Sequence, residues 1–262
     1  MKDTPFQNPV KYLLQQGKKA NGAWVQTGSP VNAEIMAAAG FDFILLDLEH
    51  GPGDNMTLLH VCQALGGTGA VPFVRAPWND FVQVKRILDA GAYGVLVPYV
   101  NTKQEANSAV KACKYPPEGI RGVAGSPRAV GYGSTKGDYL SRANDEILIL
   151  TAVETGIAVD NLDEILTVPG LDGIFIGPMD LASSLGHLGD PSHPDVQAVI
   201  RKVEQKVIAS KKTLASLTSS WDEAKAMYKR GYQMVLLMAD GISLSKMAAE
   251  KVNQFKAEFP ER

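Results

Sequence analysis

Four consecutive apolar residues run directly into charged and titratable ones in the stretch Phe43-Ile44-Leu45-Leu46-Asp47-Leu48-Glu49-His50. A continuous apolar run of this length is typical of a parallel strand that is buried on both faces. In barrels of parallel strands, the residues at the carboxyl ends of the strands carry the chemistry. The stretch therefore predicts a buried parallel strand whose last residues reach a functional edge.

Similar runs alternate with segments of helical periodicity along the rest of the chain. The expected strands are Ala23–Gln26, Phe43–Leu48, Val71–Arg75, Gly94–Pro98, Ile147–Val153, Gly173–Ile176, Thr213–Leu217 and Met234–Met238. The expected helices are Pro30–Ala39, Asn55–Leu65, Phe81–Ala90, Lys103–Cys113, Ile157–Leu166, Pro194–Ser210, Trp221–Lys229 and Ser243–Phe259. This regular alternation predicts an α/β protein with a (β/α)8 TIM-barrel fold. A doubly wound open sheet is the alternative, although no G-x-G-x-x-G follows the first strand to support dinucleotide binding.

Length and composition narrow the class of protein further. The 262 residues fit a single barrel domain, 1–262, because such barrels commonly reach about 250 residues. The 45% hydrophobic and 21% charged content is that of a globular protein, which excludes disorder and a small disulfide scaffold. The net charge of −2 provides no basic field for nucleic acid.

The pattern of the two cysteines and the lack of long apolar segments predict a cytoplasmic protein. Cys62 and Cys113 lie far apart in no metal-binding pattern, so we expect buried free thiols. The first residues lack an apolar signal core, and no run of about 18 apolar residues is present to span a membrane. We therefore expect no membrane association and a location in the cytoplasm.

One connection, at about residues 114–144, is unusually long and rich in proline and glycine. Compact domains rarely carry such a loop without a function. We expect it to leave the top of the fourth strand, where it would cover the active site or form a subunit contact. A mobile insertion without a function is the alternative.

Titratable side chains stand at the expected carboxyl ends of several strands, namely His50, Arg75, Glu154 and Asp180. Any one of them alone would be read as part of a salt bridge at the rim. Because all of these strand ends meet at one mouth of a barrel, the set together predicts an active site there. His50 is the histidine at a strand end, and an imidazole is a natural proton acceptor at neutral pH.

Glu154 and Asp180 come from adjacent expected strands, so their carboxylates would repel each other unless a proton or a cation lies between them. Two carboxylates with water and substrate oxygens is a usual way to hold Mg²⁺, and Mn²⁺ or Co²⁺ fits the same ligands. A pair that shares a proton, as in glycosidases, is the alternative. That alternative leaves Arg75 without a role, so we favour the metal.

The turn Gly177-Pro178-Met179-Asp180 leads from the sixth strand into a helix. The start of a helix presents free backbone N–H groups and the positive end of the helix dipole, which together attract anions. A 2-oxo acid would then chelate the metal and place its carboxylate on these N–H groups. Ordinary N-capping by Asp180 is the alternative reading of this turn.

The chain resembles the HpcH/HpaI aldolases in the order and spacing of several motifs, from Trp24 to about Leu237. The motifs that carry the resemblance are Phe43–His50, Val74-Arg75, Leu88–Gly91, Tyr115–Pro117, Gly119–Gly122, Val153–Thr155 and Gly173–Leu181, with Gly186–Pro191 and His193-Pro194 in addition. These are metal-dependent (class II) pyruvate aldolases that act on 4-hydroxy-2-oxo acids such as hydroxy-oxo-heptanedioate or dehydro-deoxy-glucarate. The resemblance implies a carbon–carbon lyase that splits such an acid into pyruvate and an aldehyde.

The resemblance also implies roles for individual residues. Glu154 and Asp180 match the family's metal ligands, for Mg²⁺, Mn²⁺ or Co²⁺. His50 matches the proton acceptor, and Arg75 matches the residue that stabilises the transition state. Asp89 matches the aspartate that raises the basicity of the histidine, although the helical pattern places Asp89 at the end of a helix.

The substrate-binding positions implied by the resemblance are Ala152 and the turn Gly177-Pro178-Met179-Asp180. Met179 replaces a small residue, and its backbone N–H keeps the expected contact. Ala152 stands where the family commonly has a glutamine that contacts the substrate, so a donor and an acceptor are missing. This departure leaves open an enzyme of the same scaffold that condenses or decarboxylates an oxo acid such as oxaloacetate, including a citrate-forming reaction. A non-catalytic protein that binds 2-oxo acids is a further alternative, which the intact set of site residues argues against.

Members of the family often assemble as hexamers that exchange the last helix of the barrel. The segment Ser243–Phe259 is the candidate for this exchange. We therefore expect a homo-oligomer whose other partners are small molecules, a 2-oxo acid and an aldehyde.

Overall fold

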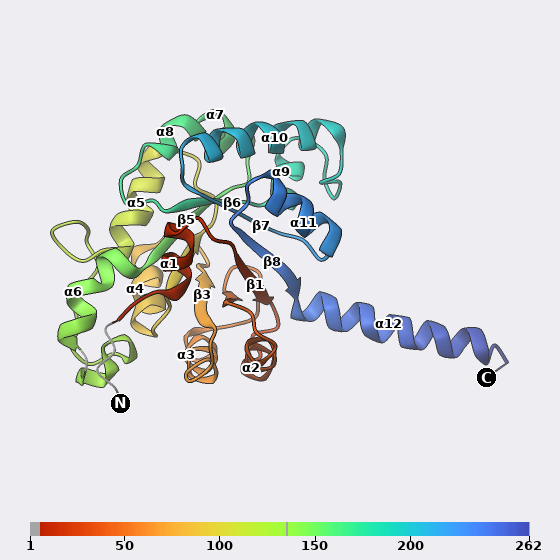
Figure 1. The fold of residues 1–262 in the computed structure, drawn as a ribbon, viewed down its shortest axis with the longest axis horizontal. Coiled ribbons are helices and arrows are strands. Elements are labelled where there is room, and N and C mark those ends of the chain that lie inside the picture. Colours follow the sequence, from red (N-terminus) through yellow and green to blue (C-terminus); the bar gives the residue numbers. More distant parts are fainter. Residues whose placement is uncertain (1–5, 135, 262) are drawn as a thin grey trace.

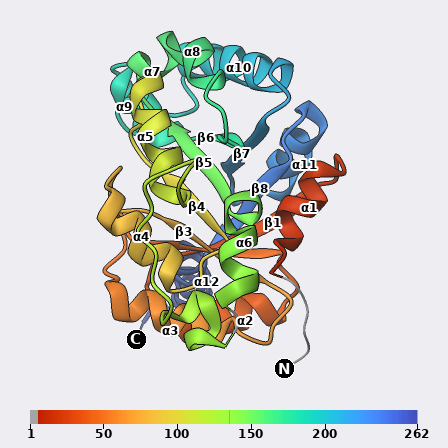
Figure 2. The same ribbon diagram turned by 90° about the vertical axis from the view of Figure 1, so that its left-hand side faces the viewer.

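The structure is a computed structural model that describes residues 6–134 and 136–261. Its parallel strands close into a barrel in chain order, with β8 paired to β1 (Figures 1 and 2). The strands are β1 (Ala20–Val25), β2 (Phe43–Asp47), β3 (Val71–Arg75), β4 (Gly94–Val97), β5 (Leu148–Val153), β6 (Gly173–Ile176), β7 (Thr213–Leu217) and β8 (Met234–Ala239). The predicted (β/α)8 fold is therefore confirmed, and the open sheet is excluded.

Helices follow the strands and surround the barrel (Figure 1). They are α1 (Pro9–Gln15), α2 (Pro30–Ala38), α3 (Asn55–Ala64), α4 (Phe81–Asp89), α5 (Lys103–Cys113), the 3-10 helix η1 (Arg128–Gly133), α6 (Lys136–Glu146), α7 (Gly156–Asp160), α8 (Leu162–Leu166), α9 (Pro178–Ser184), α10 (Pro194–Ala209), α11 (Trp221–Arg230) and α12 (Asp240–Glu258). The helix predicted over Ile157–Leu166 is divided at Asn161, whose ψ of 4° interrupts the helical backbone. The helices α1, η1 and α6 are not among those predicted, whereas α9 is the helix expected after the turn Gly177-Pro178-Met179-Asp180.

The apolar core has two layers, one inside the barrel and one between the strands and the helices. Inside the barrel the rings of Phe43 and Phe73 pack against each other, with their centroids 4.9 Å apart. Glycine makes room for them, since a Cβ at Gly94 would lie 2.8 Å from the Phe73 ring. Gly22 does the same for Phe43, because a Cβ at Gly22 would overlap the Phe43 ring.

The described residues of the long segment, 114–134 and 136–144, lie at the amino-terminal end of the barrel, so the prediction that the segment leaves the top of the fourth strand is wrong. It follows α5, and a helix that follows a barrel strand returns the chain to the end at which the next strand begins. Arg128 anchors the segment there through hydrogen bonds to the carbonyl oxygens of Cys62 (2.7 Å) and Ala90 (3.1 Å). In this chain the segment does not cover the mouth, and its part in a subunit contact stays a prediction.

The last helix, α12, extends away from the barrel (Figure 1), and its contacts with β1, with β8 and with Asn32 of α2 lie beside its first residues. It leaves large apolar side chains exposed, namely Ile242, Leu244, Met247, Val252, Phe255 and Phe259. A helix exchanged between subunits would expose such side chains when one chain is viewed by itself. The exchange remains a prediction.

The cysteines are buried free thiols, as expected, and burial raises the pKa of both Cys62 and Cys113 to about 12. Within residues 6–134 and 136–261, we find no helix with the length and apolar character needed to cross a membrane.

Candidate active site at the barrel mouth

Every second side chain of each strand points into the barrel. At the carboxyl-terminal mouth, some of these inward-pointing side chains are charged. Leu45 and Phe73 belong to the interior layer, and two residues further along their strands come Asp47 and Arg75. Successive side chains of a strand point to opposite faces, so residues two apart point the same way. Asp47 and Arg75 therefore point into the mouth from neighbouring strands.

Asp47 and Arg75 form a buried ion pair with two parallel hydrogen bonds. The Arg75 Nε and Nη2 atoms donate to Asp47 Oδ1 at 2.9 Å and to Oδ2 at 2.6 Å. Burial by itself would raise the pKa of Asp47, but the hydrogen bonds and the charge of Arg75 lower it overall. The Arg75 guanidinium also lies 4.7 Å from the centre of the Trp24 ring. The ion pair with Asp47 and this ring contact together fix the orientation of the guanidinium.

Asp47 also fixes the turn that carries His50. Its Oδ1 atom accepts the backbone N–H groups of Glu49 at 3.0 Å and of His50 at 3.2 Å. His50 lies exposed at the rim, and the Glu49 carboxylate lies 3.0 Å from Arg75 Nη1. One buried carboxylate thus connects the predicted proton acceptor with the predicted transition-state stabiliser. Asp47 has no predicted role, although aspartate commonly accepts the backbone N–H groups two and three residues further along in turns.

Glu154 is a buried carboxylate at the same mouth, with 3% of its surface exposed. Its Oε1 atom accepts the backbone N–H of Tyr99 at 2.6 Å. Burial raises the pKa of Glu154 to about 7 against the effect of the Tyr99 N–H, and the charges of Glu49 and Asp180 add to the rise. Glycine is required beside it, because a Cβ at Gly177 would lie 2.7 Å from Glu154 Oε2.

The turn after β6 offers fewer donors than predicted. Gly177 is the N-cap of α9, and its own N–H donates to the carbonyl of Val153 at 3.2 Å. Pro178 has no N–H to donate. The N–H groups of Met179 and Asp180, in the first turn of the helix, therefore remain for a substrate carboxylate. The alternative in which Asp180 is the N-cap is wrong, because Gly177 occupies that position.

Ala152 lies inside the barrel below Glu154. It is buried in the interior layer together with Leu150, and Phe175 is its register partner on β6. The alternation of β5 directs Ala152 and Glu154 to the same side, as expected. A longer side chain at position 152 would therefore extend toward the mouth.

The donor set of the mouth fits a hard divalent cation. In addition to burial, the charge of Asp180 raises the pKa of Glu49, and the charges of Glu49 and Asp180 raise the pKa of Glu154. A divalent cation removes that repulsion, and carboxylate oxygens are the ligands that Mg²⁺ and Mn²⁺ prefer. The space that Gly177 leaves at Glu154 Oε2 keeps this oxygen accessible. Glu154 and Asp180 are the residues that would hold such an ion.

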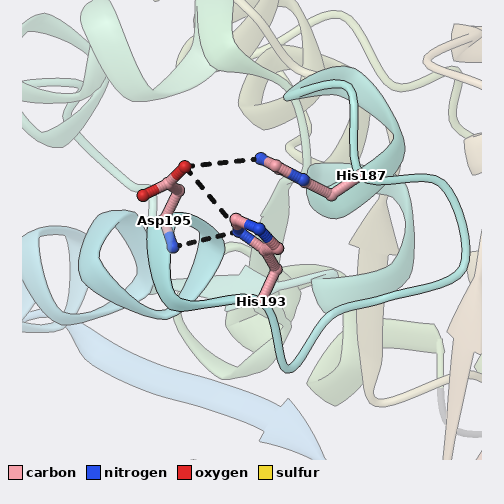
Figure 3. Close-up of side chains that lie close together, drawn as sticks. All are labelled: His187, His193 and Asp195. Atoms are coloured by element: carbon pink, nitrogen blue, oxygen red, sulfur yellow. Dashed lines mark hydrogen bonds and ion pairs between the residues drawn. The ribbon is translucent and has the colours of Figure 1, made fainter.

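A second cluster of possible metal ligands lies in the α9–α10 connection, formed by His187, His193 and Asp195 (Figure 3). Asp195 Oδ2 lies 3.7 Å from His187 Nε2 and from His193 Nδ1. The imidazoles are stacked with centroids 3.6 Å apart and planes 17° apart, so their in-plane lone pairs do not converge on one point. His193 Nδ1 already accepts the backbone N–H of Asp195 at 3.3 Å as the N-cap of α10. We assign this cluster to helix capping.

Asp89 is the predicted site residue that this chain does not bring to the mouth. It ends α4 at the opposite end of the barrel, where its carboxylate accepts a 2.8 Å hydrogen bond from Arg121. Arg121 is buried to 1% exposure, lies over the Tyr115 ring and donates to the Tyr139 hydroxyl at 3.1 Å. The contact seen within the chain is thus a structural ion pair, and the effect of Asp89 on His50 stays a prediction.

Comparison with known proteins agrees with this architecture. Residues 21–246 match the family model described as HpcH/HpaI aldolase/citrate lyase. The chain is 40% identical over 252 residues to a 5-keto-4-deoxy-D-glucarate aldolase from Escherichia coli O6:H1, which covers 96% of this chain and 98% of that protein. A solved HpcH/HpaI aldolase/citrate lyase family protein from Burkholderia cenocepacia J2315 is 33% identical, with a TM-score of 0.91 over 95% of this chain and 100% of that one.

A solved citrate synthase, SbnG, is 26% identical, with a TM-score of 0.87 over 97% of this chain and 100% of that one. Together with the barrel fold, these relatives place the chain among enzymes of the lyase class. The chain belongs to the HpcH/HpaI aldolase/citrate lyase family. The predicted family and the predicted enzyme class are confirmed.

The stability of the metal-free protein should fall as the pH rises from 4.5 to 7. Unfolded Glu154 ionises near its ordinary pKa of 4.5, whereas the folded protein holds that proton up to about pH 7. This difference lowers the free energy of unfolding by up to about 3 kcal/mol across that range. The glutamine in Glu154→Gln does not titrate. The free energy of unfolding, measured with urea in the presence of a chelator, should therefore rise in the variant relative to wild type as the pH rises. A difference between the two proteins that does not change with pH would contradict this assignment.

Asp89→Asn should destabilise the fold, because it leaves the buried guanidinium of Arg121 without its countercharge. The expected loss is about 1–3 kcal/mol in the free energy of unfolding, measured with urea. Asp163→Asn is the matched control, because Asp163 pairs with Lys206 at the surface, where ion pairs contribute about 0–1 kcal/mol. Equal losses in the two variants would rule out a structural role for Asp89.

Proposed function

We propose that this protein is a divalent-metal-dependent aldolase that splits a 4-hydroxy-2-oxo acid into pyruvate and an aldehyde, and joins them in reverse. The observation that carries the proposal is the buried Glu154 carboxylate, which shares one mouth with Asp180 and the Asp47-bound Arg75. The 40% identity to a 5-keto-4-deoxy-D-glucarate aldolase favours a substrate derived from a sugar acid.

Substrate binding would use both the carboxylates and the turn after β6. Glu154 and Asp180 would hold Mg²⁺, Mn²⁺ or Co²⁺, and a cation bound there supplies Lewis-acid stabilisation of the charge that develops on the 2-oxo oxygen. The N–H groups of Met179 and Asp180 would meet the substrate carboxylate at the start of α9. Gly177 and Pro178 shape this turn without donating.

The proposed reaction begins when His50, directly or through a water molecule, accepts the proton of the 4-hydroxyl group. The C3–C4 bond then breaks, C4 leaves as the aldehyde carbon, and the electron pair stays with the pyruvate part as an enolate. Arg75, held in its plane by Asp47, stabilises the negative charge of the enolate. A proton delivered to C3 completes pyruvate.

The test is the exchange of the C3 protons of pyruvate in deuterated water, followed by NMR. The wild-type protein with Mg²⁺ or Mn²⁺ should exchange them, because the enolate forms reversibly, whereas a protein that only binds 2-oxo acids would not. Chelator treatment and Glu154→Gln should each abolish the exchange. Full exchange after complete removal of metal would refute the metal-dependent mechanism.

His50→Ala should lower the turnover of retro-aldol cleavage by about 10²–10⁴-fold, the usual contribution of a positioned general base. Pyruvate binding, measured by calorimetry, should persist because Glu154, Asp180 and the turn after β6 are unchanged. An unchanged turnover would remove His50 from the mechanism.

A second candidate is a relative on the same scaffold that condenses or decarboxylates an oxo acid such as oxaloacetate. Two observations favour it, the alanine at position 152 and the 26% identity to a citrate synthase. Product analysis with oxaloacetate, with and without an acceptor, separates this candidate from the aldolase.

Ala152→Gln should shift the preference between acceptors more than it shifts metal affinity. Position 152 points to the same side as Glu154, so a glutamine there would enter the space that an acceptor or a water molecule fills in the wild-type protein. The measurement is kcat/KM for a short and a long aldehyde in both proteins. Equal ratios would mean that the alanine does not affect substrate choice.

We also propose a homo-oligomer, a hexamer by resemblance, in which the exposed apolar face of α12 packs on another copy. A cytoplasmic location is supported by the two free thiols, since such thiols persist in a reducing compartment.

A further inference from the structure

Tyr99 follows β4 in a backbone conformation that is uncommon for a residue with a side chain. Its φ is +50°, in the left-handed region. Residues held in this region usually persist because surrounding contacts require it, and such residues concentrate at functional sites. The contacts of Tyr99 therefore need an explanation.

Two groups of Tyr99 contact the two carboxylates that would hold the cation. The backbone N–H donates to Glu154 Oε1 at 2.6 Å, across 55 residues of sequence. The side-chain hydroxyl lies next to the carboxylate of Asp180, which adds to the burial that raises the pKa of Tyr99. A tyrosine hydroxyl is protonated at neutral pH and can therefore donate to that carboxylate.

The ring of Tyr99 is itself held in place. It stacks on Trp78, with ring centroids 5.9 Å apart and planes 28° apart. Trp78 comes from the connection between β3 and α4, so contacts from three further parts of the barrel converge on Tyr99. A donor that is fixed in this way loses little conformational entropy when it orients a carboxylate.

Metal-ligating carboxylates are commonly hydrogen-bonded themselves, and these outer partners hold the ligand oxygens in the geometry that the metal needs. We propose that Tyr99 is the positioning residue of the metal site, holding Glu154 through its backbone N–H and Asp180 through its hydroxyl. This inference rests on the proposed function, because it takes these two carboxylates as the ligands of the cation. It adds a residue that the sequence argument did not identify.

The variant Tyr99→Phe isolates the hydroxyl, because the ring, its stacking on Trp78 and the backbone N–H all remain. Metal-free wild-type and variant proteins are titrated with Mn²⁺, and free Mn²⁺ is measured by electron paramagnetic resonance. The dissociation constant should rise by about 10- to 100-fold in the variant. The thermal midpoint of the metal-free proteins should stay the same, and at saturating Mn²⁺ the variant's aldol turnover should approach that of wild type.

Two further variants make the outcomes distinct. Tyr12→Phe removes the hydroxyl of an exposed tyrosine on α1 and should leave Mn²⁺ affinity unchanged. Glu154→Gln should abolish the binding measured in wild type, which tests the proposed metal site itself. If Glu154→Gln removes binding but Tyr99→Phe binds as tightly as wild type, the role of Tyr99 alone is overturned. If Glu154→Gln leaves binding unchanged, the proposed metal site and the role of Tyr99 are both overturned.

Discussion

In a closed parallel barrel, every second side chain of each strand points into a confined interior, and the other parts of this structure depend on that constraint. Below the mouth the interior is filled by rings such as Phe43 and Phe73, with Gly22 and Gly94 making room for them. At the mouth the same alternation delivers charged groups instead of apolar ones. The alternation of side chains along the strands therefore accounts for both the apolar core and the charged site.

The two buried carboxylates of the mouth show how the neighbouring charges decide their chemistry. Asp47 and Glu154 are both buried, and burial alone favours their protonated forms. Asp47 has the guanidinium of Arg75 against it, so its pKa falls and it serves as a fixed anion. Burial raises the pKa of Glu154 to about 7, the charges of Glu49 and Asp180 add to the rise, and this environment favours a cation. The first carboxylate positions catalytic groups, and the second is suited to hold a metal.

Two further residues of the mouth bear on the proposed function. Ala152 presents only a methyl group beneath the mouth, so its side chain offers no hydrogen bond to a substrate. Tyr99, which follows β4, places its hydroxyl next to Asp180. Substitutions at these two positions would change substrate choice and metal affinity without removing a carboxylate.

Local patterns in the sequence determined the strands, most of the helices and the charged ends of the strands. Apolar runs and helical periodicity depend on neighbours a few residues away, so residues such as Arg75, Glu154 and Asp180 were assigned to the mouth from sequence. Tertiary structure alone decided that the described residues of 114–144 pack at the opposite end, that Asp89 pairs with Arg121, and that the Gly177 N–H is bonded to Val153. It also decided that Tyr99 contacts Glu154. Such contacts join residues far apart in the chain, and a hydrogen bond between them depends on the relative placement of whole elements, which no local pattern records.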